Sequence, residues 1–371
     1  MLARVRDIAD IMESLFPLDL AEDWDNVGLQ IGSWQAPVSR VMVALDLDHQ
    51  VLQQALLQKV DMIITHHPLF FKAIKSIDYD QAQGKLVRKI IEAGINVYAA
   101  HTNMDAGERG INQILAECIG LQGIQPLDSG HRERLYKLVV YVPAGHEDAV
   151  RQAVLEAGAG HLGRYADCSF KSRGIGTFLP LEGSSPFIGR EGIREEVEEY
   201  RFETVVPQAK LNQTLQAMIQ AHPYEEVAYD LFLLENSGTV FSLGRIGQLA
   251  VEMSLAEFCS QVKRSLDLKF LRVVGDMKRV VKKVAVVSGA GASFMGTAGR
   301  RGCDVLLTGD LKYHEARDAE AMGLAVVDAG HQASEEIICS HLSGLLRQES
   351  QRRGVEVELS YINNQECIRT F

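Results

Sequence analysis

The chain has 371 residues, 46% hydrophobic and 23% charged, which are the proportions of a globular protein long enough for two or three domains. Its formal net charge of −11 argues against a bulk electrostatic attraction to nucleic acid or to an anionic membrane. No apolar run reaches membrane-spanning length, and the first residues alternate like an amphipathic helix and not like a signal peptide.

The cysteines are scattered and include no C-x-x-C pair. This spacing argues against a thiolate zinc site and against a disulfide scaffold, and it favours a reducing compartment. We therefore expect a cytoplasmic protein. The six positions are Cys118, Cys168, Cys259, Cys303, Cys339 and Cys367.

The first third of the chain alternates between helical and strand patterns. Apolar periodicity and stop residues such as Pro17 and Gly120 mark the element ends. This alternation is typical of βαβ units and a mostly parallel sheet. We expect helices over 4–16, 50–59, 84–92 and 111–119, and strands over 41–45, 62–64 and 95–100.

The pattern changes near residue 125. The next segment has the order strand, helix, short strands, helix, strand, which is the order of a small ferredoxin-like α+β module. Its short strand candidates lie in a Gly-, Ser- and Pro-rich region. The expected elements are a strand over 136–142, a helix over 147–157, the region 172–192, a helix over 208–221 and a strand over 228–234.

The βαβ rhythm returns after residue 240, so the middle segment is predicted to be an insertion. We expect strands over 283–287, 304–308, 324–328 and 355–359 and a helix over 335–346. The predicted fold class is α/β, with a two-part doubly wound, mostly parallel sheet core. Residues 1–125 form its first half, 126–238 the ferredoxin-like insert, and 239–371 its second half.

Two adjacent histidines, His66 and His67, follow the predicted strand at 62–64, with Pro68 behind them. Ligands of open α/β sheets gather outside the carboxyl ends of the strands. Neighbouring side chains on extended backbone point to opposite sides, so this pair would serve two ions, or one ion and one outer contact. The alternative is a pair of loop histidines bonded to backbone.

Two further strand ends carry residues of the same kind. Histidine nitrogen and carboxylate oxygen suit divalent ions such as zinc, manganese, iron or cobalt, and a carboxylate can bridge two of them. Singly, Asp105 and His331 could be helix-capping residues. Strand ends of one sheet that all carry histidine or acid are harder to explain by capping. The predicted metal ligands are His66, His67, Asp105, His331 and Glu335.

Three other residues are candidates for catalytic or orienting roles. Asp310 and His314 follow the strand at 304–308, and His101 follows the strand at 95–100. Ligating histidines usually need an acceptor that orients them, and a hydrolase needs an acid or base. The alternative for Asp310 is a cap on the following helix.

Three other motifs allow both a functional and a structural interpretation. The turn at 288–294 is glycine-rich, but it lacks the third glycine of a dinucleotide fingerprint and a Walker lysine, which favours a tight strand–helix turn. The segment His222–Glu226 is either a site or a turn. Residues 23–26 are either the mouth of a pocket or a solvated turn.

These motifs together resemble the NGG-interacting-factor-like family, whose members are often named GTP cyclohydrolase 1 type 2 homologues. The resemblance covers essentially the whole chain, and the insert matches the longer members. The matching segments are Trp24–Leu29, Thr65–Pro68, Ala100–Asp105, His222–Glu226, Leu243–Gly247, Thr308–Asp310 with His314, and Asp328–Glu335.

The resemblance implies a two-metal site formed by the five predicted ligands. It also implies a homohexameric toroid with the sites facing an inner cavity, and an insert like that of trimeric signalling or metal-tolerance proteins. One departure is Gln332, where the family pattern has an aromatic residue on a pocket wall.

Two functions are weighed. The first is a metal-dependent hydrolase with two divalent ions (zinc, iron or manganese) that acts on a small molecule or nucleotide, with His101, Asp310 and His314 as catalytic residues. The second is a non-enzymatic metal-binding scaffold, metallochaperone or regulatory ring protein. Nucleic-acid binding in a ring is disfavoured by the negative charge, and no membrane partner is expected.

Overall fold

The computed structural model describes residues 3–236, 238–365 and 367. The chain divides into two compact units, one formed by the described parts of Met1–His131 and Phe241–Phe371 and the other by those of Arg132–Val240. The first is called the core unit below, and the second the insert. The short strands β8 (His131–Arg132) and β13 (Val240–Phe241) lie where the chain passes from one unit to the other.

The first sheet of the core unit has the strand order β19-β4-β5-β6-β2. Its pairs are parallel from β19 to β6, and only β2 runs antiparallel to its neighbour. This sheet is the mostly parallel sheet that the sequence predicts. The strands are β2 (Gly28–Ile31), β4 (Arg40–Ala44), β5 (Met62–Thr65), β6 (Asn96–Ala99) and β19 (Glu358–Tyr361).

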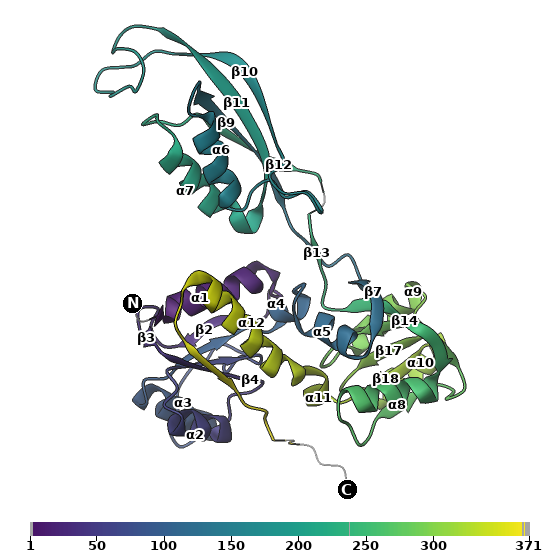
Figure 1. Cartoon of the computed structure of the whole chain (residues 1–371). Coiled ribbons are helices and arrows are strands. Elements are labelled where there is room, and N and C mark those ends of the chain that lie inside the picture. The colour runs from purple at the N-terminus through teal and green to yellow at the C-terminus, as the bar shows by residue number, and fades with distance from the viewer. Residues whose placement is uncertain (1–2, 237, 366, 368–371) are drawn as a thin grey trace. The chain divides into compact units, whose positions relative to one another are not determined.

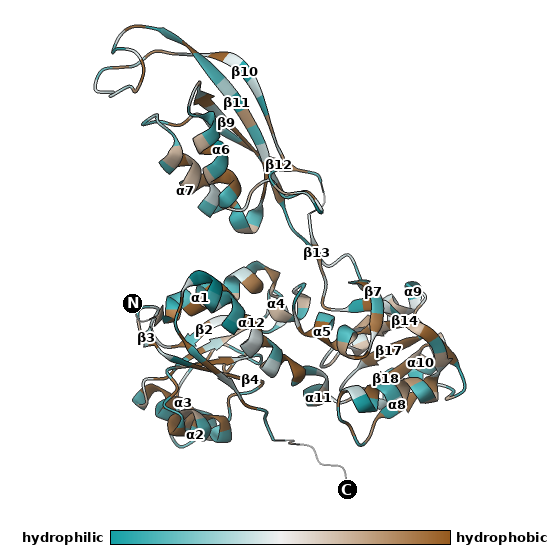
Figure 2. Cartoon of the chain, in the orientation of Figure 1, coloured by the Kyte–Doolittle hydropathy of each residue, from teal (hydrophilic) through white to brown (hydrophobic). Residues whose placement is uncertain are grey.

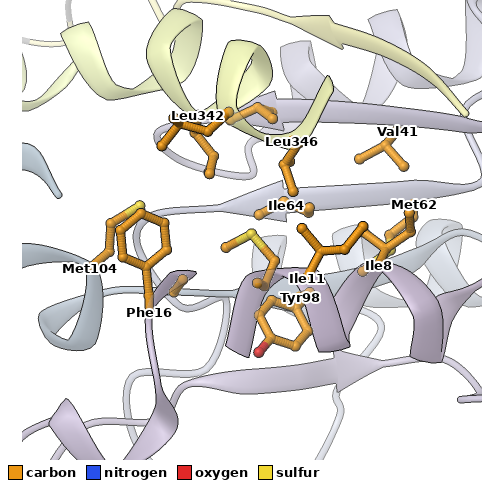
Figure 3. Close-up of a cluster of buried hydrophobic side chains, with 14 of the residues drawn as sticks. Ile8, Ile11, Phe16, Val41, Met62, Ile64, Tyr98, Met104, Leu342 and Leu346 are labelled. Carbon is orange, nitrogen blue, oxygen red and sulfur yellow. The ribbon is translucent and has the colours of Figure 1, made fainter. Parts of the chain in front are cut away.

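Helices cover both faces of the first sheet because its strands are apolar on both sides. Along β4, Val41 and Val43 pack with α1 (Val5–Leu15) and α12 (Ile337–Arg353), as Figure 3 shows for part of this cluster. The alternate residue Met42 belongs to a second cluster with α2 (His49–Leu57) and α3 (Ala82–Glu92). Each fully buried Val, Leu, Ile or Met side chain stabilises such a layer by about 1.5–3 kcal/mol.

The second sheet has the order β15-β18-β17-β16-β14-β7 and is mixed. Only the β16–β17 and β17–β18 pairs are parallel, and the other three pairs are antiparallel. The prediction of a mostly parallel sheet is therefore wrong here, because apolar patterning does not give the direction of a strand. The strands are β7 (Leu121–Pro126), β14 (Arg245–Ser254), β15 (Arg272–Val274), β16 (Val280–Val286), β17 (Val305–Thr308) and β18 (Ala325–Asp328).

Helices cover both faces of this sheet too. One cluster holds α5 (Ile111–Cys118) and α8 (Leu255–Ser265), and the other holds α9 (Met295–Arg300) and α10 (Tyr313–Met322). The helix α8 begins at a capping box in which Ser254 and Glu257 exchange hydrogen bonds. Its ribbon alternates between hydrophobic and hydrophilic segments, as expected of a helix with one buried face (Figure 2).

The two halves of the core unit exchange elements. β7, which precedes the insert, pairs with β14, which follows it. The carboxyl-terminal α12 and β19 return to the first sheet, where α12 lies beside α1 (Figure 1). Arg245 ties the halves together: its buried guanidinium donates to the main-chain oxygens of Ala106 and Gly107 and of Ser242 and Gly244.

The insert is a four-stranded antiparallel sheet with the order β10-β11-β9-β12 and two helices. Its core forms between β9, β11 and the helices, around residues such as Val140, Val150 and Phe202. The Gly-, Ser- and Pro-rich region 172–192 begins inside β10 and ends before β11, and both strands are longer than the short ones predicted there. The elements are β9 (Leu135–Pro143), α6 (Glu147–Glu156), β10 (Ser169–Phe178), β11 (Glu195–Pro207), α7 (Leu211–Ala221) and β12 (Tyr229–Leu234).

The remaining elements are short. β1 (Ala3–Arg4) pairs with β3 (Pro37–Val38), and α4 (Thr102–Ala106) and α11 (His331–Glu335) follow strands of the core unit. The 3-10 turns are Leu18–Leu20, Gln208–Lys210 and Ala292–Phe294. Within the described residues, no helix has both the length and the apolar character needed to cross a bilayer. All six cysteines are free thiols.

Candidate metal centre

Histidines and carboxylates from both sheets of the core unit converge at one place. His66 and His67 follow β5, and His101 follows β6 and precedes α4, which carries Asp105. His331 and Glu335 are the first and last residues of α11, which follows β18. The structure therefore brings all five predicted ligands together with His101.

The Nδ1 atom of each imidazole in this cluster is held by an oxygen. Carbonyl and carboxylate oxygens only accept, so each Nδ1 carries the proton and each Nε2 of a neutral ring offers a lone pair. The four pairs are His66 with the Ala100 carbonyl at 3.1 Å, His67 with Asp46 at 2.9 Å, His101 with Asp25 at 3.0 Å, and His331 with Asp310 at 2.7 Å.

The Nε2 atoms face carboxylate oxygens. Those of His67 and His331 both lie 3.1 Å from Glu335 Oε2. Nε2 of His66 lies 3.8 Å from Glu335 Oε1 and 3.7 Å from Asp105 Oδ1. A lone pair that faces a carboxylate is unfavourable unless a cation, either a proton or a metal ion, lies between them.

Three of these atoms are buried without a hydrogen-bond partner among the residues that the structure describes: His66 Nε2, Asp105 Oδ1 and Glu335 Oε2. Buried polar atoms without partners are costly, and a bound divalent ion would satisfy all three. Two overlapping groups have ligand atoms within 4.8 Å of one another, His66 with His67 and His101, and His67 with His331 and Glu335. The donor set thus fits a divalent metal ion.

The pKa values show how strongly this cluster attracts positive charge. Burial would lower the pKa of His67, but the adjacent Asp46 and Glu335 carboxylates, which stabilise the protonated ring, raise it to about 10. The Glu335 carboxylate and Asp310 raise the pKa of His331 to about 9. Burial, together with the Glu335 charge, raises the pKa of Asp105 to about 7. Burial would raise the pKa of Glu335, but the surrounding histidines hold it well below its usual range.

The glycine-rich turn after β16 makes room for Glu335. Gly289 has φ +59°, and a Cβ there would lie 2.3 Å from Glu335 Oε1. The turn's amides have partners inside the protein: Ser288 N donates to Asn112, Gly289 N to Ser334 and Gly291 N to Thr308. This pattern favours the tight-turn interpretation over a phosphate loop.

Two residues behind the histidines were not among the predicted site residues. Asp46 lies two residues beyond the end of β4, and that position at a strand's carboxyl end was the available signal. Asp25 lies in the segment interpreted as a pocket mouth or a solvated turn. It accepts from His101 and from the amide and hydroxyl of Thr102, and these bonds outweigh burial and lower its pKa to about 2.

The three predicted catalytic residues differ in position. His101 lies in the cluster. Asp310 holds His331 Nδ1, and its backbone φ of +55° is uncommon for a non-glycine residue. His314 is exposed on α10 and contacts the Tyr313 ring, and it belongs to neither of the two groups of possible metal-binding atoms found among the described residues. Gln332 donates to Glu336 and to the Asn364 carbonyl.

The core fold and its cluster together define an α/β protein with a candidate site for divalent metal ions at the ends of its strands. The chain belongs to the Duf34/NIF3 (NGG1p interacting factor 3) family, whose profile matches residues 3–367. The resemblance expected from the motifs is confirmed.

The chain is similar in sequence to bacterial proteins of about the same length. The GTP cyclohydrolase 1 type 2 homolog of Bacillus subtilis is 46% identical over 330 residues, which cover 89% of this chain and 88% of that protein. The protein of the same name from Halalkalibacterium halodurans is 43% identical over 334 residues, 90% of each chain. A Bacillus cereus protein related to NIF3 has a solved structure with a TM-score of 0.93, 40% identity and full coverage of both chains.

Proposed function

We propose that this chain is a metal-dependent hydrolase that holds two divalent ions, zinc, iron or manganese, in the cluster. The ligands would be His66, His67, Asp105, His331 and Glu335, with Glu335 shared between the ions. The observation that carries the proposal is the convergence of three histidine Nε2 atoms on the carboxylates of Glu335 and Asp105, at a place where His66 Nε2, Asp105 Oδ1 and Glu335 Oε2 are buried without a hydrogen-bond partner among the described residues. When bound, two such ions polarise a carbonyl or phosphoryl group and activate water.

The chain's own residues would hold the ligands in place and move protons. Asp46 and Asp310 fix the ring orientation of His67 and His331. His101, oriented by Asp25, presents Nε2 towards His66 and His67 and can accept a proton from water or substrate. We therefore retain His101 as the proton carrier, assign Asp310 to an orienting role, and give His314 no direct role.

The substrate class rests on the names of the relatives. Two are called GTP cyclohydrolase 1 type 2 homologs, so a nucleotide is the first substrate to test. The homohexameric ring and the cytoplasmic location rest on the resemblance and on the cysteine pattern. For the insert, the strand order β10-β11-β9-β12 with its two helices supports a ferredoxin-like fold.

The alternative is a metal-binding scaffold without turnover. One observation favours it: Asp310 is engaged with His331, and His314 is exposed and belongs to neither group of possible metal-binding atoms among the described residues, so fewer free acids or bases are available than the sequence predicts. Metal content and turnover together separate the two functions.

The test combines elemental analysis with a turnover screen on GTP and model phosphoesters. The wild type should hold about two ions per chain and show turnover that requires the metal. Glu335→Gln should lose both. Glu191→Gln, which changes an exposed glutamate of the insert outside every candidate motif, is the matched control and should keep both. Bound metal with no turnover would favour the scaffold, and no metal after reconstitution with zinc, iron and manganese would overturn both functions.

A further inference from the structure

Two exposed aromatic rings form a small platform in the core unit. The rings of Trp24 and Phe71 stack with their centroids 5.7 Å apart and their planes 24° from parallel. Trp24 is 56% exposed and Phe71 49% exposed. Rings of this size usually bury most of their surface, and exposed contiguous apolar surface marks a binding site more often than scattered single residues do.

The platform borders the metal cluster. The His101 ring contacts Trp24 at 5.9 Å and Phe71 at 5.5 Å, both edge-on. The same imidazole lies 4.9 Å from the His66 ring and 5.5 Å from the His67 ring. Only one imidazole therefore separates the platform from the predicted ligands.

Hydrogen bonds hold the two parts of the platform together. Asn26 Nδ2 donates to the Phe70 carbonyl at 2.7 Å. Gln30 Oε1 accepts from the Phe70 amide at 3.3 Å, and Gln30 Nε2 donates to the Asn26 carbonyl at 2.9 Å. These bonds join the segment that carries Trp24 to the segment that carries Phe71.

Each residue of the tripeptide Trp24–Asn26 thus has a separate structural role at the site. Trp24 supplies a ring, Asp25 orients His101, and Asn26 fixes the loop that carries the second ring. A binding surface fixed in advance loses less entropy when its ligand arrives.

We propose that the outer face of one ring of the stacked Trp24–Phe71 pair stacks a planar heteroaromatic ring of the substrate and so places the substrate ring's polar substituents at the cluster. This inference rests on the proposed function and names the substrate class of the same site. Aromatic rings stack on nucleobases of any sequence because every base has a π face. The platform therefore selects a ring, and the cluster selects the group that is attacked.

The test compares GMP with ribose 5-phosphate, which share the sugar phosphate and differ in the base. Calorimetric titration of the full chain should show GMP binding roughly tenfold more tightly. Phe71→Leu and Trp24→Leu keep an apolar side chain but remove a ring, and each should abolish most of this difference while leaving ribose 5-phosphate binding unchanged.

Trp24 also provides a direct signal. The chain has two tryptophans, Trp24 and Trp34, so Trp34→Phe leaves Trp24 as the sole indole. Saturable quenching of its emission by GMP, at the concentrations found by calorimetry, would place the base on the platform. Equal binding of GMP and ribose 5-phosphate would overturn the proposal.

Metal content is measured on the same samples, so the two proposals can fail separately. Absence of metal from the wild type would contradict the proposed function. The difference in affinity between GMP and ribose 5-phosphate would still test the stacking proposal independently. If Trp24 emission changes when the protein is diluted but not when GMP is added, a second copy of the chain covers the platform. That result would overturn stacking of a substrate ring.

Discussion

Two histidine motifs of this chain, one in the insert and one in the core unit, have opposite hydrogen-bonding patterns. In the insert, buried His222 donates from Nε2 to the Tyr141 carbonyl at 3.0 Å and accepts at Nδ1 from the Tyr224 amide at 3.1 Å. Both ring nitrogens have main-chain partners, and burial lowers the pKa of His222. In the core unit, His67 and His331 use one nitrogen to reach an outer carboxylate and turn the other towards Glu335.

The comparison shows that the second ring nitrogen separates a structural histidine from a candidate ligand. A neutral His222 is fully satisfied by the turn that it closes, and it has nothing left to offer a metal. The histidines of the cluster are incomplete until a cation lies between them and Glu335. Each variant below alters only one of the two histidine motifs.

The largest effect is expected from His67→Asn. The substitution removes a ligand from both groups of possible metal-binding atoms, so metal affinity should fall by more than about 100-fold, beyond the usual effect of losing an outer partner. Equilibrium dialysis against a competing chelator measures the loss. Retention of wild-type affinity would show that His67 is not a ligand.

A smaller loss is expected from Asp46→Asn. This change keeps the shape of the side chain but removes the carboxylate that accepts from His67 Nδ1. Metal affinity should fall by about 10- to 100-fold, because the imidazole loses its fixed tautomer and orientation. The same dialysis assay applies. Asp148→Asn, which changes an exposed carboxylate on α6, should have no effect and serves as the control.

The converse change is His222→Phe in the insert. It leaves the Tyr141 carbonyl and the Tyr224 amide without their ring partners, and buried groups of this kind cost about 2 kcal/mol when unpaired. We expect lower thermal stability with unchanged metal content, measured by calorimetry and elemental analysis. Loss of metal in this variant would mean that the two motifs are not separate in function.

The last prediction concerns the pH dependence of metal affinity and needs no substitution. In the metal-free chain the pKa values of His67 and His331 are about 10 and about 9, so both rings carry a proton at neutral pH. Metal ligation needs the neutral ring, so binding releases protons and affinity rises with pH, by about tenfold per unit for each proton, until these groups have titrated. Titration calorimetry in buffers of different protonation enthalpy counts the protons. Zero release at pH 7 would contradict the ligand assignment.

The sequence predicts where strands end more accurately than it predicts which strands pair. Local patterns place His66, His67 and His331 just after apolar strands, because a strand and its exit loop are encoded by neighbouring residues. The pairing of β7 with β14 could not be read, because the two strands lie on either side of the insert. Strand direction was missed for the same reason, since it depends on the path of the chain and not on the pattern within a strand.

The outer partners of the site show the same limit. Asp46 lies 21 residues before His67 in the sequence, and Asp25 lies 76 residues before His101. No spacing rule links such pairs, because they meet only through the order of strands in the sheet. His314 shows the opposite error: it is close to Asp310 in sequence but lies on the exposed surface of α10.

The most direct test of the metal centre is an anomalous-diffraction map of crystals grown after reconstitution with zinc. We predict two peaks in the cluster, about 2.0–2.2 Å from nitrogen or oxygen atoms of His66, His67, Asp105, His331 and Glu335, with Glu335 shared between them. A map without peaks in the cluster, with the Nε2 atoms of His67 and His331 still 3.1 Å from Glu335 Oε2, would show that protons alone fill the site and would contradict the account.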